Sequence, residues 1–134
     1  MSDEVIVDRE PIDVMFRAVT DDQEGISAGW AEVENAVGLR GRKFYGAVNE
    51  DANEYLVCAQ LRDGDDPTAF GLQRGTLPGG RYARVRLEGE PPGIYAEIAP
   101  TFDRLAARPD RDPTRPVLEY YRRADAIDLL LPVR

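Results

Sequence analysis

The chain has 134 residues with ordinary apolar and charged fractions, so it suits one folded domain with a single core and is not a disordered chain. Its formal net charge of -8 disfavours nucleic-acid binding by this chain alone, because an acidic surface repels the phosphate backbone. It has no histidine and one cysteine, which excludes Ser-His-Asp and Cys-His catalysis and argues against a zinc site, so we expect no metal and no cofactor.

The first half of the chain predicts a strand, a helix and a hairpin. Residues 1–10 are charged and expected to be frayed, apart from the short apolar stretch at residues 5–7, and residues 12–19 predict the first strand. The helix is predicted by apolar residues at helical spacing and a glycine that ends it, namely Ile26, Trp30, Val33, Val37 and Gly38. Two further strands are predicted around a polar loop, at residues 42–48 and 54–61 with the loop at 49–53.

The second half repeats this order after a polar segment at residues 62–67, which is the best internal boundary. Strands are predicted at residues 70–77 and 81–88, on either side of a turn at residues 78–80. A helix follows, with apolar residues at helical spacing and a proline that should kink or restart it, namely Ile94, Ile98, Phe102, Leu105 and Pro100. A loop with three prolines and a closing hairpin complete the chain, at residues 108–116, 117–122 and 127–133.

The shared order of strand, helix, strand and strand predicts an α+β fold built from two βαββ units. The first unit covers about residues 11–61 and the second about residues 69–133, within a single domain of residues 1–134. Two such units packed about a pseudo-twofold axis can share one antiparallel sheet, with both helices packed on one side of it. The seam between the units is then the expected cleft, because pockets favour interfaces between structural units.

No apolar run approaches the roughly 20 residues that span a bilayer, and the acidic N-terminus is not followed by a signal-peptide pattern. The single cysteine, Cys58, cannot form an internal disulfide and lies on an apolar strand, where we expect an inert core residue. These features predict a cytoplasmic protein that does not bind membranes.

Three stretches of the second half, at residues 77–83, 116–121 and 127–133, occur in an order and spacing that resemble the GyrI-like, or effector-binding, domain family. The first half matches this family through the helix of Trp30 and the stretch at residues 44–46. The resemblance covers about residues 11–133 and implies a duplicated βαββ fold.

The resemblance also implies a function. The family includes the effector domains of multidrug-sensing regulators of the MerR and AraC classes, stand-alone proteins such as the gyrase inhibitory protein, and hydrolases of cyclopropane-bearing genotoxins. In the drug-sensing members a buried glutamate ringed by aromatic residues receives cationic lipophilic drugs, and Glu119 matches that position. This chain lacks the DNA-binding segment of the regulators and is shorter than we expect of the hydrolytic members.

Glu119 is therefore the central candidate for a ligand site. Strand alternation places it on one face with Val117 and Tyr121, and places Leu118 and Tyr120 on the other face. The pattern alone fits a solvent-facing residue, since unpaired glutamate is rarely buried; with the resemblance, we predict a pocket residue. A carboxylate in an apolar cavity should have a raised pKa when the cavity is empty, and a ligand cation would supply the missing partner. Aromatic walls would attract the same cation by roughly 0.5–2 kcal/mol each.

Five aromatic residues complete the predicted ligand-binding set. Tyr45 is predicted to be the counterpart of Glu119 in the first half, and its alternative role is that of a packing residue with its hydroxyl in water. Trp30 shares its helix face with apolar residues, so it is either a core residue or a wall of the ligand site. The remaining predicted walls are Tyr82, Tyr95 and Tyr121.

A cluster of arginines on the strand at residues 81–88 is a second feature that bears charge. It fits a solvated strand face paired with acidic neighbours, and its alternative role is an anion or partner site. The cluster consists of Arg81, Arg84 and Arg86.

These observations predict a stand-alone binding module that captures an amphipathic, cationic small molecule, as a sensor or a sequestering protein. Two alternatives remain. One is a protein-interaction module of the gyrase-inhibitor type, which would need an exposed apolar or charged patch and a protein partner. The other is a hydrolase of cyclopropane-bearing genotoxins, with Glu119 as general base and a tyrosine hydroxyl as acid. We expect binding without turnover, and product formation would separate the two.

Overall fold

A computed structural model of the protein describes residues 4–49 and 52–134. Its strands are β1 (Val5–Arg9), β2 (Ile12–Thr20), β3 (Phe44–Asn49), β4 (Glu54–Gln60), β5 (Gln73–Leu77), β6 (Gly80–Glu88), β7 (Val117–Arg123) and β8 (Ala126–Pro132). In these described residues all eight strands belong to one sheet, in the order β1-β6-β8-β7-β3-β4-β2-β5. Every neighbouring pair is antiparallel. The predicted α+β class is confirmed.

In the part of the chain that the structure describes, two α-helices, α1 (Gln23–Val37) and α2 (Ile98–Ala106), accompany the sheet. Asp22 caps α1 by accepting a hydrogen bond from the backbone N–H of Gly25 at 2.6 Å, and Gly38, with φ of 79°, ends the helix as predicted. A 3-10 helix, Gly93–Glu97, leads directly into α2. The predicted restart therefore comes just before Pro100, which lies in the first turn of α2, where a missing N–H costs no hydrogen bond. Neither helix of the described ranges has the length and apolar character needed to cross a membrane.

The two halves have the same element order and the same strand pairing. β1 and β5 both have five residues, β2 and β6 both have nine, and β4 and β8 both have seven. The first residue of β1, Val5, pairs with the fifth residue of β6, Arg84; in the same way the first residue of β5, Gln73, pairs with the fifth of β2, Phe16. If each strand is replaced by its counterpart in the other half (β1 by β5, β2 by β6, β3 by β7, β4 by β8, and the reverse), the strand order of the sheet is read backwards. A pseudo-twofold axis thus passes between the central strands β3 and β7.

Each half is a ββαββ unit, one strand longer than the predicted βαββ unit, and its first strand pairs with the other half. β1 pairs with β6, and β5 pairs with β2. The predicted fraying of the N-terminal residues, from which residues 5–7 were excepted, is wrong for Asp8 and Arg9, and β1 as a strand was not predicted because its pairing partner lies far away in the sequence. Where the two exchanged strands cross, a Cβ on Gly79 would lie 2.6 Å from the nitrogen of Pro11 and 2.7 Å from the carbonyl oxygen of Arg9. Only glycine allows this close approach of the two chains.

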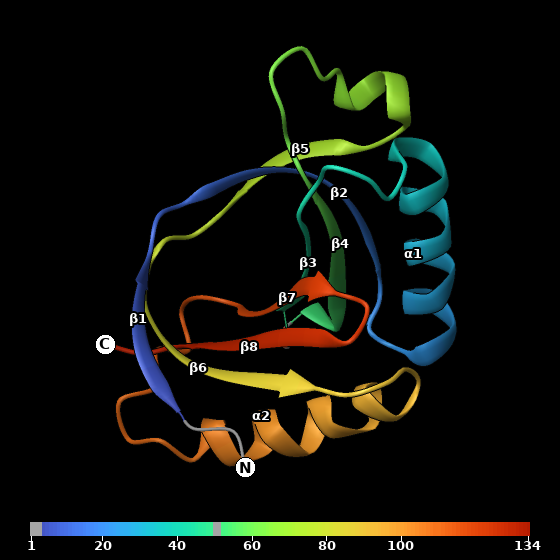
Figure 1. The fold of residues 1–134 in the computed structure, drawn as a ribbon. Helices are drawn as coiled ribbons and strands as arrows, with labels where there is room; N and C mark the ends of the chain where they lie inside the picture. The colour runs from blue at the N-terminus through green and yellow to red at the C-terminus, as the bar shows by residue number, and fades with distance from the viewer. Residues whose placement is uncertain (1–3, 50–51) are drawn as a thin grey trace.

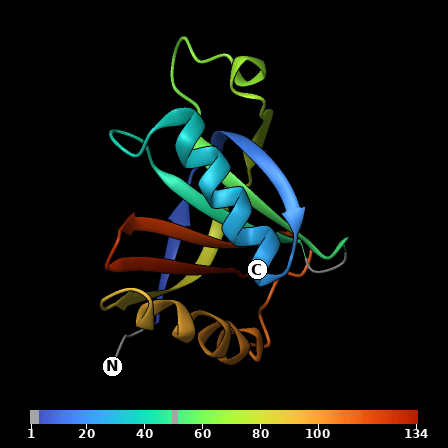
Figure 2. The ribbon, with the colours of Figure 1, turned by 90° about the vertical axis from the view of Figure 1, so that its right-hand side faces the viewer.

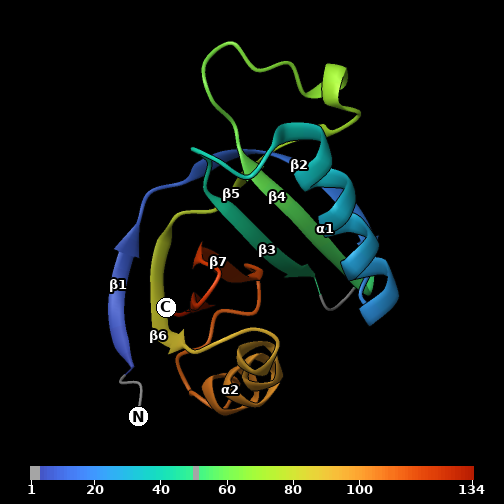
Figure 3. The ribbon, with the colours of Figure 1, turned by 45° about the vertical axis from the view of Figure 1, so that its right-hand side comes forward.

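The sheet curls around, so that it has a concave face and a convex face (Figures 1 and 3). Both helices lie on the convex side, which we call the helix-bearing face. α1 packs there on a cluster that includes Met15 and Val57, and α2 packs on a cluster that includes Val85 and Leu129. The concave face encloses a third cluster, which consists of Val14, Tyr45, Ala47, Cys58, Leu77, Tyr82, Leu118 and Leu130.

One predicted strand boundary is wrong. Residues 70–77 were predicted as a strand, but β5 begins only at Gln73, because Pro67–Phe70 forms a 3-10 helix. Asp66 caps this helix by accepting a hydrogen bond from the N–H of Thr68 at 3.2 Å. The other predicted strands agree with the observed ones to within two residues at each end. Residues 50–51 of the predicted loop and residues 1–3 of the predicted frayed terminus lie outside the described residues.

Candidate functional site

Glu119 lies near the middle of the sheet, on β7 and on the helix-bearing face. Figure 2 shows the β7–β8 hairpin between the two helices. Only 6% of the surface of Glu119 is exposed, so it does not face solvent. Tyr121 shares its face, as strand alternation predicts, whereas Leu118 belongs to the concave cluster.

Two tyrosine hydroxyls donate hydrogen bonds to the same carboxylate oxygen of Glu119. The hydroxyls of Tyr55, on β4, and Tyr121 each lie 2.6 Å from Glu119 Oε1. Tyr55 is absent from the predicted site, although alternation along β4 places it on one face with Val57. Which face this is depends on the register between β3 and β4, and a shift of one residue would reverse it. We call Tyr55, Glu119 and Tyr121 the carboxylate cluster.

Gly46, on β3, leaves the space that the carboxylate cluster occupies. It pairs directly with Glu119, and a Cβ at this position would overlap the Tyr55 hydroxyl and lie 2.8 Å from Glu119 Oε1. Gly46 is thus the symmetry counterpart of Glu119. The predicted equivalence of Tyr45 and Glu119 is wrong by one residue, since Tyr45 pairs with Tyr120.

Burial raises the pKa of the Glu119 carboxyl, because the charged form loses its hydration. The hydrogen bonds from Tyr121 and Tyr55 favour the charged form and oppose this shift, while the negative charge of Asp21 adds to it. Burial, followed by the charge of Glu119, also raises the pKa of both tyrosine hydroxyls. The tyrosines therefore remain protonated donors, and the carboxylate is the titrating member of the cluster.

Aromatic rings from α1 and β3 pack beside the carboxylate cluster. The Trp30 ring lies 5.0 Å from the Tyr121 ring at an interplanar angle of 69°, and 6.2 Å from the Phe44 ring at 65°. Tyr95, which is 48% exposed, is close enough for its charge to influence the pKa of Tyr121. Direct contacts thus join three residues of the predicted set, namely Glu119, Tyr121 and Trp30, while Tyr95 lies in the neighbourhood of Tyr121.

The other two predicted residues, Tyr45 and Tyr82, lie on the opposite side of the sheet. Both belong to the concave cluster, with exposed fractions of 1% and 0%. Tyr45 stacks on Tyr120 at a ring distance of 4.8 Å, and the Arg9 guanidinium donates to its hydroxyl at 3.1 Å. The sheet itself separates these side chains from Glu119, so they do not form one site with it.

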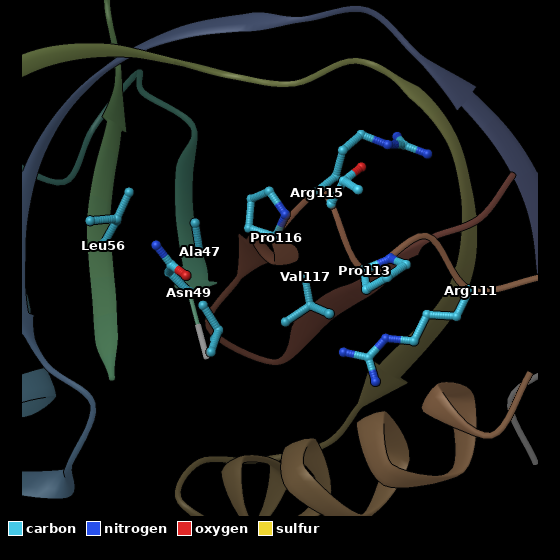
Figure 4. Close-up of a pocket in the computed structure, with 10 residues that line it drawn as sticks. Ala47, Asn49, Leu56, Arg111, Pro113, Arg115, Pro116 and Val117 are labelled. Atoms are coloured by element: carbon cyan, nitrogen blue, oxygen red, sulfur yellow. The ribbon is translucent and has the colours of Figure 1, made fainter. Parts of the chain in front are cut away.

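A cavity of about 350 Å³ lies away from Glu119, between the end of β3 and the segment that leads into β7 (Figure 4). Its apolar lining includes Ala47, Leu56 and Val117, and its polar lining includes Arg115. The guanidinium of Arg115 donates to the carbonyl oxygens of Gly79 at 3.1 Å and of Val133 at 2.8 Å. Arg115 therefore has a structural role at the edge of this cavity.

Metal and thiol chemistry find no support in the described residues. No group of three or more Asp, Glu, Cys or His side chains there is arranged to hold a metal ion. Cys58 is fully buried on β4, and burial raises the pKa of its thiol to about 12. Such a thiol is protonated at neutral pH and is a poor nucleophile.

The raised pKa of Glu119 predicts how stability depends on pH. The folded state binds this proton more tightly than the unfolded state, so Glu119 makes folding less favourable as pH rises from about 4.3, the unfolded pKa, through the raised folded value. Glu119→Gln removes this contribution, and its amide oxygen can still accept from Tyr55 and Tyr121. We expect the free energy of unfolding of the variant, minus that of the wild type, to increase over this interval and then level off. Urea unfolding of both proteins across the pH range measures this difference in the free energy of unfolding. A difference that does not change with pH would contradict the prediction.

No family model and no curated protein matches this sequence. Solved structures do match it over 98% of its length. An integron cassette protein from the mobile metagenome of Vibrio cholerae has a TM-score of 0.75 and 18% identity, with 95% of that chain covered. A protein solved with bound tetraphenylphosphonium has a TM-score of 0.69 and 12% identity, with 94% of that chain covered. A hydrolase from Listeria innocua has a TM-score of 0.57 and 11% identity, with 91% of that chain covered.

These structural neighbours have the GyrI-like, effector-binding fold, and the present chain shares it. The fold expected from the motifs of the second half is thereby confirmed. Because the identities are all below one fifth, the likeness is one of fold.

Proposed function

We propose that this protein binds lipophilic cations on the helix-bearing face, at the seam between its two halves, with Glu119 as the anion that receives the ligand charge. The observation that carries this proposal is the environment of the carboxylate. Glu119 is buried, its hydrogen bonds come from uncharged tyrosines, and the groups that shift its pKa include no cation. A buried carboxylate without a cationic partner is costly, and a ligand cation would remove that cost.

The surroundings of Glu119 favour a large apolar cation over a small hydrated one. Trp30, Phe44 and Tyr121 offer flat aromatic surface, which attracts a cation and tolerates ligands of different shape. A protein of the same fold has been solved with tetraphenylphosphonium, a cation whose charge is surrounded by aromatic rings. That complex supports the ligand class proposed here.

Access to the carboxylate requires movement of aromatic side chains. Trp30 and Tyr121, whose rings lie 5.0 Å apart, are partly exposed, whereas Tyr55 is 2% exposed and Glu119 is 6% exposed. We propose that the Trp30 and Tyr121 rings rotate outward to admit the ligand, with Tyr55 holding the carboxylate in place. Tyr95, at the exposed edge, would then contact the outer part of a bound ligand.

Calorimetric titration with tetraphenylphosphonium and with neutral triphenylphosphine oxide tests this function. We expect the cation to bind more tightly, by tenfold or more, which is about 1.4 kcal/mol. Its affinity should increase as pH rises through the raised pKa of Glu119, with proton release on binding below that range. Equal affinity for the two compounds at all pH values would contradict the proposal.

Hydrolysis is the second candidate, because a carboxylate with a raised pKa beside tyrosine hydroxyls can act as a general base and a hydrolase shares the fold. Mass spectrometry after incubation with a cyclopropane-bearing compound distinguishes the two functions. A hydrated product that forms with the wild type and not with Glu119→Gln would assign hydrolysis; unchanged compound is consistent with binding alone.

A further inference from the structure

The concave face of the sheet, opposite Glu119, carries a row of polar side chains. Tyr120, on β7, pairs with Tyr45 on one side and with Asp128 on the other. Asp128 pairs in turn with Arg86 on β6. Since paired residues share a face, these side chains lie next to one another across four neighbouring strands.

Asp128 is the buried anion of this row. It is 1% exposed and accepts hydrogen bonds from Arg86 Nε at 2.7 Å and from Arg86 Nη2 at 3.3 Å. The Nη1 atom of Arg122 lies 3.6 Å from Oδ2 of the same carboxylate, the oxygen that also accepts from Arg86 Nη2. Two guanidinium groups therefore share one carboxylate, and the side chains of Arg86 and Arg122 remain 34% and 43% exposed.

Two more arginines reach the same face without a carboxylate partner in the described residues. Arg84, two residues before Arg86 on β6, has a buried Nε that makes no hydrogen bond. Arg9, on β1, donates from Nη2 to the Tyr45 hydroxyl at 3.1 Å, and its guanidinium carbon lies 5.5 Å from the centre of the Tyr120 ring. We call Arg9, Arg84, Arg86 and Arg122 the arginine cluster.

A group of arginines with few carboxylates beside them is unusual for this chain, which has 25 acidic and 17 basic residues. Several other arginines have a carboxylate of their own, as in the pairs Arg42–Asp65 at 2.6 Å, Arg108–Asp110 at 2.9 Å and Arg115–Asp112 at 3.0 Å. On the concave face, Arg86 and Arg122 share Asp128, and Glu88 adds a weaker attraction for Arg86. The cluster therefore holds more cations than its own carboxylates neutralise.

We propose that the arginine cluster is a second ligand site, which binds a phosphate group. Guanidinium groups match the oxygen atoms of a phosphate through paired hydrogen bonds, and a charge close to -2 neutralises more of the cluster than a single carboxylate does. The net charge of -8 repels long polyanions and restricts the ligand to small phosphate-bearing molecules. Because the site lies across the sheet from Glu119, it does not depend on the proposed cation site.

Titration of the full chain with inorganic phosphate, followed by NMR or calorimetry, tests the proposal, with sodium chloride at matched ionic strength as the reference. We expect saturable binding that weakens fivefold or more in Arg84→Gln and in the more exposed Arg122→Gln. Arg81→Gln is the matched control, because Arg81 lies on the same strand and the opposite face. It should bind phosphate as the wild type does, and so should Glu119→Gln.

Three results would overturn the assignment. The first is a phosphate effect no larger than that of chloride, and the second is an equal loss in Arg84→Gln and Arg81→Gln. The third is succinate binding as tightly as phosphate, because the site would then select dicarboxylates. Circular dichroism of each variant establishes that a loss of binding does not come from unfolding.

Discussion

Glu119→Gln is expected to weaken tetraphenylphosphonium binding at least tenfold at neutral pH, which corresponds to about 1.4 kcal/mol or more. Removing one partner of a desolvated charge pair typically costs about 2–5 kcal/mol, so the expected loss is a lower bound. The substitution keeps the shape of the side chain, and the amide oxygen can still accept from Tyr55 and Tyr121. The change therefore isolates the charge, and calorimetric titration measures it.

Two comparisons make this result specific to the site. Binding of neutral triphenylphosphine oxide should change little or improve, because it gains nothing from the carboxylate. Glu32→Gln removes the same charge from the surface of α1, where Glu32 pairs with Arg17 at 2.8 Å and is 55% exposed. It should leave cation binding nearly unchanged. Equal losses for charged and neutral ligands would instead give Glu119 a purely structural role.

Gly46→Ala is expected to cause the largest loss of stability of any substitution considered for this protein. The new methyl group would overlap the Tyr55 hydroxyl, and Tyr55 is too buried to move freely. Overpacking of a core costs about 1–3 kcal/mol. Loss of the hydrogen bond from Tyr55 to Glu119 would add about 1.5–3 kcal/mol, the range for bonds to charged groups. We expect a total loss of about 2.5–6 kcal/mol in the free energy of unfolding, measured by urea denaturation.

The matched control for this substitution is Gly93→Ala. A Cβ at Gly93 would meet no atom within 4 Å, so that variant should be nearly as stable as the wild type. Tyr55→Phe removes the hydroxyl that the new methyl group would strike. The double variant Gly46→Ala with Tyr55→Phe should therefore lose less stability than the sum of the two single variants. Strict additivity, or a stable Gly46→Ala protein, would show that the close approach at Gly46 is not important.

The fold follows well from the sequence where the pattern is local. The apolar spacing around Trp30 and the glycine at position 38 predict α1, and the turn at residues 78–80 separates β5 from β6. β1 is missed because its pairing with β6 joins residues as distant as Val5 and Arg84, and short apolar stretches carry no sign of a distant partner. The start of β5 is misplaced because apolar Phe70 resembles a strand residue, whereas Asp66 and Pro67 begin a 3-10 helix.

The carboxylate cluster is predicted only where one strand suffices. Alternation along β7 places Glu119 and Tyr121 together, and both lie in the carboxylate cluster. The counterpart of Glu119 on the partner strand depends on where β3 begins. β3 starts at Phe44, so Gly46, its third residue, corresponds to Glu119, the third residue of β7. An alignment shifted by one residue selects Tyr45 and turns attention to the wrong face. The same uncertainty hides Tyr55, whose orientation depends on the pairing of β4 with β3.

During synthesis, Val5–Arg9 leaves the ribosome long before Gly80–Glu88, so β1 must wait for most of the chain before it can pair. Pairings between distant segments form slowly, and neither half can complete its share of the sheet alone. Assembly is therefore expected to be one late, cooperative event. Once it has occurred, three strand pairs join the halves, β1 with β6, β2 with β5 and β3 with β7. A protease cut at residues 62–67 would consequently leave two fragments that continue to hold each other.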